Sequence, residues 1–154
     1  MNDDLLFEIT DGGDIIKIQP IEQPYKDSVH DWDKNCIRTL LTIKGGAFKG
    51  QYQAEMYTFE FEKFKQDLRR AYKDLKSEFT FSCRDHELVL KIKGDGNGHF
   101  TVDCTAMDQP TIGGELRFQL SFDQTYIPEL VNQLNDITKA FPIVGTEYTV
   151  KNEY

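Results

Sequence analysis

Length, composition and charge place this chain among globular domains. It has 154 residues, of which 39% are hydrophobic and 29% are charged, and a chain of this size buries enough surface to fold without disulfides or metals. Its formal net charge of −8 disfavours direct binding to nucleic acid or to an anionic membrane, because such binding draws its affinity from clustered Lys and Arg. We therefore expect a single domain over residues 1–154.

The N-terminal segment 1–35 is the most acidic part of the chain. It carries nine Asp and Glu against three Lys, a net charge of −6. Two apolar runs, 5–9 and 15–19, flank the turn signal Asp11-Gly12-Gly13 and predict a hairpin. Pro20 then leads into an irregular connection that contains His30-Asp31-Trp32-Asp33. We interpret this segment either as a solvated edge or as a docking patch for a basic protein.

The middle of the chain changes from strand to helix patterns. Two runs rich in strand-forming residues, 36–44 and 47–59, are joined by Gly45-Gly46 and predict a second hairpin. From Glu60 to Lys76 the apolar residues recur at helical spacing, which predicts an amphipathic helix. For its basic flank a solvated face is favoured over a contact with phosphates or an acidic partner, because acids are interspersed. These basic residues are Lys63, Lys65, Arg69, Arg70, Lys73 and Lys76.

The second half repeats strands followed by a helix. Three apolar alternations, at 79–83, 88–92 and 100–104, are separated by short turns and predict an antiparallel meander. A strictly alternating strand follows at 115–122, and then an amphipathic helix that ends at Phe141-Pro142. The tail, Glu147 to Tyr154, either adds a short strand or frays. The predicted fold class is α+β: a largely antiparallel, twisted sheet or half-barrel of about eight strands with two packed helices, in the order strands, helix, strands, helix.

No pattern in the sequence predicts catalytic chemistry. Cys36, Cys83 and Cys104 lack the spacing of a zinc site, and we interpret all three as small buried hydrophobes. The three His residues share no metal-binding spacing, and the stretch that starts at Asp95 has Ala106 where a calcium loop needs Glu. We expect no catalytic residues, no cofactor and no metal site. An enzyme stays open only through a site assembled from distant residues.

Several framework patterns carry a resemblance to a known family. Trp32 precedes a strand, Gly-Ala-Phe-Lys-Gly follows at Gly46 to Gly50, and the first helix contains Phe61, Phe64 and Leu68. The last strand and helix contain Leu116-Arg117-Phe118, Phe122-Asp123-Gln124-Thr125 and Leu130. Over roughly residues 30–142 the chain resembles the WapI-type immunity proteins of bacterial polymorphic toxin systems.

The resemblance implies a non-enzymatic protein that binds and neutralises the C-terminal toxin domain of a cognate toxin, often a nuclease. On this hypothesis the candidate contact residues are Asp27, Asp31, Trp32 and Asp33, in the irregular connection, with the three acids first. For Trp32, an anchor in the core or at a strand edge is favoured over a contact in the interface. We expect cytoplasmic localisation, because the N-terminus lacks the basic and apolar regions of a signal peptide and no stretch is apolar enough to span a membrane. Two alternatives stay open: a small-ligand-binding domain that uses a concave sheet face, and a homodimeric interaction domain.

Overall fold

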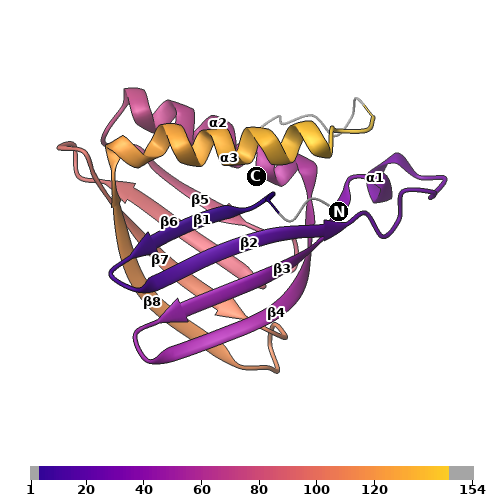
Figure 1. The fold of residues 1–154 in the computed structure, drawn as a ribbon, viewed down its shortest axis with the longest axis horizontal. Coiled ribbons are helices and arrows are strands. Elements are labelled where there is room, and N and C mark those ends of the chain that lie inside the picture. The colour runs from indigo at the N-terminus through magenta and orange to yellow at the C-terminus, as the bar shows by residue number, and fades with distance from the viewer. Residues whose placement is uncertain (1–3, 146–154) are drawn as a thin grey trace.

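The computed structural model describes residues 4–145, which form eight strands, three α-helices and a short 3₁₀ turn (Figure 1). The expectation for Glu147 to Tyr154 lies outside the described residues. In chain order the elements are β1 (Phe7–Asp11), β2 (Asp14–Glu22), α1 (Asp31–Lys34), β3 (Cys36–Gly45), β4 (Phe48–Tyr57), α2 (Thr58–Lys73), β5 (Glu78–Ser82), β6 (Leu88–Gly94), β7 (His99–Met107), β8 (Glu115–Asp123), the 3₁₀ turn (Gln124–Tyr126) and α3 (Ile127–Ala140).

The strands form two separate four-stranded antiparallel sheets. One has the order β1-β2-β3-β4 and the other β5-β6-β7-β8, so every strand pairs with its neighbour in sequence. The predicted turn at residues 11–13 is confirmed: Asp11 pairs with Asp14, and Gly12 and Gly13 between them have φ of 57° and 97°. A two-residue hairpin turn of this type needs positive φ at both central positions, which glycine adopts without strain.

The prediction of one continuous sheet of about eight strands is wrong, although the α+β class and the strand number are confirmed. The reason is α2, which follows β4 without a loop and has 16 residues. A helix of that length is about 24 Å long, so it carries the chain away from β4 before β5 begins. The structure also adds α1, a single turn between β2 and β3 that the sequence did not predict.

The same unit of four strands and a helix occurs twice in the chain, although the sequence shows no repeat. The buried apolar residues of the two long helices have identical spacing: Phe61, Phe64, Leu68 and Ala71 on α2, and Ile127, Leu130, Leu134 and Ile137 on α3. Each helix lies against the first strand of the other unit, α2 beside β5 and α3 beside β1. The two halves of the molecule are therefore related by approximate symmetry.

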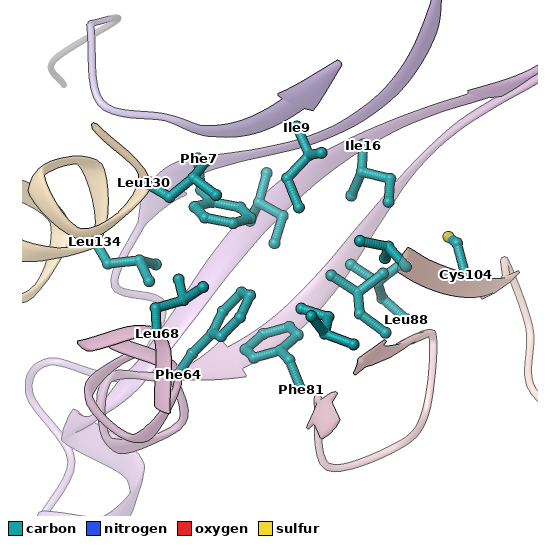
Figure 2. Close-up of a cluster of buried hydrophobic side chains, with 14 of the residues drawn as sticks. Phe7, Ile9, Ile16, Phe64, Leu68, Phe81, Leu88, Cys104, Leu130 and Leu134 are labelled. Carbon is teal, nitrogen blue, oxygen red and sulfur yellow. The ribbon is translucent and has the colours of Figure 1, made fainter. Parts of the chain in front are cut away.

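The core lies between the inner faces of the sheets and the two long helices. Figure 2 shows side chains from both sheets and both helices pointing into one cluster. Phe64 of α2 stacks on Phe81 of β5 with ring centroids 4.6 Å apart, and contacts Phe7 of β1 at 5.0 Å. Residues from both halves thus share one core, which explains why neither sheet is exposed on its inner face.

Two polar side chains of α2, those of Lys65 and Glu60, form contacts that fix the position of the helix. Lys65, which the sequence analysis placed on a solvated flank, is instead buried between α2 and α3, where its ammonium donates to Thr138 Oγ1 at 3.1 Å. Glu60 begins the change from strand to helix: its carboxylate accepts a hydrogen bond from the Tyr57 N–H at 2.7 Å. This contact explains why β4 ends at Tyr57, two residues before the predicted end of the strand.

Gly94 provides a test of how tightly α2 and the second sheet are joined. A Cβ at this position would lie against the Leu75 carbonyl oxygen and 2.8 Å from the Phe100 ring. We expect Gly94→Ala to lower the free energy of unfolding by about 2 kcal/mol and the melting temperature by about 5 °C. Gly50→Ala is the matched control, because its nearest neighbour would be the Tyr52 ring at 3.9 Å. Equal melting temperatures for the two variants would contradict this packing.

Candidate protein-binding surface

The connection between β2 and β3 projects from the body of the protein. We call residues 23–35 the arm; it contains α1 and extends beyond the end of the first sheet (Figure 1). All four residues that the sequence analysis singled out, Asp27, Asp31, Trp32 and Asp33, belong to it. The structure therefore brings these residues together on one projecting segment.

An aromatic cluster fixes the arm to the body. The Trp32 ring lies 4.8 Å from the Phe59 ring and 5.4 Å from the Tyr57 ring, measured between centroids. The guanidinium of Arg84, in the turn between β5 and β6, lies 5.5 Å from the Trp32 ring centroid, at cation–π distance. Trp32 is half-buried by these contacts. It links the arm to both halves of the molecule, because Phe59 starts α2 and Arg84 follows β5.

The side-chain amide of Asn35 fixes the C-terminal end of the arm. Asn35 is fully buried, and its Nδ2 donates to the carbonyl oxygens of Asp31 at 3.0 Å and Val144 at 2.9 Å. Its Oδ1 accepts from the Val144 N–H at 2.8 Å, while its backbone carbonyl accepts from the Thr58 N–H at 3.0 Å. One residue thereby joins the arm to the start of α2 and to the segment after α3. A buried amide with these bonds has a defined position.

The exposed side of the arm combines acids with apolar side chains. Asp27 is exposed; Asp31 lies 3.5 Å from the Lys34 ammonium, and Asp33 accepts a hydrogen bond from the Ser28 hydroxyl at 3.1 Å. Val29 is 88% exposed and Tyr25 is 43% exposed, with the Tyr25 hydroxyl donating to Glu55 at 2.9 Å. Exposed apolar groups surrounded by charge are typical of protein contact surfaces.

Val29 and Tyr25 were not identified from the sequence. The available signal was weak: each is an isolated apolar residue in a polar stretch, and only the structure shows that Val29 is left exposed by the other residues of the range 4–145. Arg84 was missed as well, because its contact with Trp32 joins positions 52 residues apart in the chain. The surface thus combines residues of two connections, the one between β2 and β3 and the one between β5 and β6.

The first turn of α2, next to the aromatic residues that contact the arm, contains a buried carboxyl group. Glu60 is 8% exposed, and burial raises its pKa to about 8, an effect opposed by hydrogen bonds from the backbone of Tyr57 and Arg84 and increased by the charges of Glu87 and Asp85. At neutral pH this group is therefore mostly protonated. It adds no full negative charge to the surface around the arm.

The three thiols are buried, as predicted from their positions in strand patterns. Burial raises the pKa of Cys36 and of Cys104 to about 12, and it also raises the pKa of Cys83. A thiol acts as a nucleophile or metal ligand through its thiolate, so these side chains are poorly suited to either role. Within residues 4–145, no group of three or more His, Cys, Asp or Glu side chains is arranged to hold a metal ion.

Two surface hollows are large enough to receive part of a partner. One, of about 410 Å³, lies between α2 and β5. The other, of about 360 Å³, lies between the β3–β4 turn and the β7–β8 connection, with Tyr52 and Leu116 on its wall and exposed Phe48 at its rim. The inner faces of the sheets are filled by the core. A small ligand on a concave inner face, one of the alternatives from the sequence, would have to displace that core.

Comparison with known proteins identifies the family. The model of the immunity protein WapI-like family matches residues 6–142. The chain belongs to this family. Membership in an immunity family implies a protein toxin as partner in general terms, and the resemblance predicted from the sequence is confirmed.

Among the helices described in the structure, none combines the length and apolar character needed to cross a membrane.

A solved structure shares the fold. Trypanosoma brucei MRP1/MRP2 superposes with a TM-score of 0.51 and 10% sequence identity, over 89% of this chain and 86% of the other. The plant transcriptional regulator PBF-2 gives a TM-score of 0.44 and 13% identity, over 88% and 81% of the two chains. Among curated proteins, none matches the sequence. At these identities the likeness to MRP1/MRP2 concerns the fold alone.

The raised pKa of Glu60 predicts how stability depends on pH. The folded protein holds a proton on Glu60 that the unfolded chain releases above pH 4.5, so the free energy of unfolding falls as the pH rises from about 4.5 to about 8. Glu60→Gln retains an oxygen for the Tyr57 N–H but cannot ionise. We expect the variant to equal the wild type near pH 4.5 and to be more stable at pH 9, by roughly 1–3 kcal/mol.

Denaturant unfolding at pH 4.5 and pH 9 measures this difference. Glu78→Gln is the control for the removal of a carboxyl group, because Glu78 is exposed on β5. If Glu60→Gln and the wild type lose stability in parallel between the two pH values, the carboxyl group of Glu60 is not the cause.

Proposed function

We propose that this protein neutralises the C-terminal toxin domain of a cognate polymorphic toxin by binding to it, without chemistry of its own. A nuclease is the toxin class that fits best, because an acidic protein can cover the basic surface with which a nuclease holds its substrate. The chain would act in the cytoplasm of the cell that it protects. Family membership supports the immunity role, while the identity of the toxin domain is part of the proposal.

The observation that carries the proposal is the arm. It projects from the body, exposes Val29 and Tyr25, and has three aspartates close to them. It is also held in one position by Trp32 and Asn35, whose contacts reach both halves of the fold. A preorganised segment loses little conformational entropy on binding. Its exposed apolar side chains can provide affinity, and the neighbouring charged side chains can provide specificity. We therefore place the main contact with the toxin on the arm.

A survival assay tests the function directly. Cells would express the C-terminal domain of the large toxin encoded beside this protein, with or without this chain. We expect survival only when the chain is present. An unrelated toxin domain serves as the control for specificity, since rescue should be confined to the cognate domain. Death of the cells despite soluble expression of the chain would rule the proposal out.

Charge removal on the arm tests where the toxin binds. The triple variant Asp27→Asn, Asp31→Asn, Asp33→Asn removes three negative charges and keeps an oxygen acceptor for Ser28. We expect its Kd for the toxin domain to rise by at least tenfold at low salt, with a weaker dependence on salt concentration. The melting temperature should change little, because these carboxylates are on the surface.

The matched control removes the same charge elsewhere, with Asp103→Asn, Glu129→Gln and Asp136→Asn, three exposed residues outside the arm. Calorimetric titration of both triple variants gives the comparison. Equal loss of affinity in the two variants would show that net charge, and not the arm, controls binding.

A further inference from the structure

The free edge of β5 presents unpaired backbone groups. The Cys83 N–H donates to the Leu88 carbonyl and the Gly94 N–H donates to the Ser77 carbonyl, so the odd-numbered residues of this strand face β6. In an antiparallel pair the alternate residues point their N–H and C=O groups the other way. Glu78, Thr80 and Ser82 therefore direct their backbone groups away from the sheet. Within residues 4–145 no hydrogen bond to these edge groups is present.

A groove runs along this edge. We call the hollow of about 410 Å³ between α2 and β5 the β5 groove. One wall is the edge of β5; the other is a stripe of α2 that contains Glu60, Lys63, Asp67 and Arg70, with the Phe64 ring between them. Asp67 is held by both neighbours, with its carboxylate 2.8 Å from Lys63 Nζ and 2.9 Å from Arg70 Nη2. The charged groups of the wall thus interact with one another and leave the β5 edge open.

In the other half, a side chain of the protein itself bonds to the symmetry-related strand edge. There Glu8 lies between the buried residues Phe7 and Ile9, as Thr80 lies between Phe79 and Phe81. The Glu8 N–H donates to Gln133 Oε1 of α3 at 3.0 Å. Gln133 precedes the third buried residue of α3, and Asp67 occupies the same place on α2. The hollow beside β1 has a volume of only about 80 Å³.

The difference between the edges of β1 and β5 indicates which of the two edges can bind a partner. Where Gln133 is present, the protein satisfies one N–H of its own strand edge and the space beside that edge is small. Where Asp67 takes its place, the space beside the edge is larger and is available to a partner. Exposed strand edges are usually blocked in soluble proteins because they pair with other chains. We infer that the β5 groove receives an extended segment of the toxin domain, which adds to the second sheet as a fifth strand beside β5.

The inference rests on the proposed function and extends it, because the groove adjoins the arm. The turn that follows β5 carries Arg84, which contacts Trp32 of the arm. Glu60 lines the groove and directly follows Phe59, which contacts Trp32 of the arm. A toxin that covers the arm could therefore place a neighbouring segment in the groove. Binding by strand addition takes its affinity from backbone hydrogen bonds and its specificity from side chains.

The charges at the two ends of the β5 groove indicate which toxin segment would bind there and in which direction it would run. At the end beside the arm, the acids Asp31, Asp33 and Asp85 outnumber the bases Lys34 and Arg84. At the opposite end, the side chain of Arg70 is 57% exposed on the helix wall, and Lys93 lies opposite Glu78 in the register of β5 and β6. The complementary segment is extended, has a basic side chain next to the arm and an acidic one next to Arg70.

A second copy of this chain fits the groove less well. Pairing β5 with β5 of another copy would bring the two α2 helices side by side, each with Lys63 and Arg70 on the approaching wall. Lys63 and Arg70 share a single acidic partner, Asp67, so this group has a net positive charge on each helix, and like charges on facing helices oppose association. The oligomeric state is nevertheless one readout of the experiment below.

Removing one edge donor tests the inference. Thr80→Pro deletes the N–H that points into the groove, and proline is tolerated on an edge strand where the N–H faces outward. Thr80→Val keeps the N–H and the strand preference and is the matched control. With the full chain and the cognate toxin domain, we expect Thr80→Pro to raise Kd by at least tenfold and Thr80→Val to change it by less than threefold. Circular dichroism and melting curves check that both variants fold.

A second variant guards against disruption of the strand by proline. Asp67→Gln places on α2 the type of side chain that bonds to the equivalent edge beside β1. We expect this variant, in which no residue of β5 is substituted, to weaken toxin binding by a similar factor. Hydrogen exchange supplies an independent readout: the amides of Thr80 and Ser82 should become protected when the toxin domain binds to the wild type.

The possible results separate the two proposals. No binding of the toxin domain by the wild-type chain overturns the proposed function and this inference with it. Tight binding that survives both Thr80→Pro and Asp67→Gln, without protection of Thr80, overturns the inference alone. A wild-type dimer in light scattering that Thr80→Pro converts to a monomer would also overturn it, because a second copy would then occupy the groove.

Discussion

The fold depends on burial of two sheets that are apolar on one face only. Neither half can bury its own inner face: the second sheet needs Phe61 and Phe64 of α2, and the first needs Leu130 of α3 as well as side chains from the opposite sheet. Each helix therefore covers the first strand of the other half, and the two halves fold as one unit. The outer faces and the strand edges are then the surfaces left for function.

Approximate symmetry of the two halves makes their differences informative. The apolar residues of α2 and α3 follow the same spacing, as a shared core requires. The polar residues differ: Gln133 bonds to the edge of β1, whereas Asp67 bonds to its neighbours on α2. Only the first half carries the arm, which replaces the tight turn found between β6 and β7 in the corresponding place. Departures from the symmetry therefore coincide with the two surfaces to which we assign binding.

Much of the fold could be predicted from local patterns. Alternation located the strands, helical spacing located α2 and α3, and strand positions identified the buried cysteines, because each signal depends on neighbours in sequence. The division into two sheets could not be predicted, since nothing local states that a 16-residue helix separates β4 from β5 in space. The acids of the arm were found by composition. The contacts of Trp32 with Arg84 and of Gln133 with Glu8 join distant residues, so they required the structure.

The bond between Asn35 and Val144 has a consequence for biosynthesis. It joins residues 109 positions apart, so it cannot form until residue 144 has left the ribosome. A nascent or truncated chain that lacks residue 144 also lacks this constraint on the end of α1, even when the first sheet's sequence is present. The arm thus acquires its final geometry later than the strands that flank it, and its order depends on the folding of both halves.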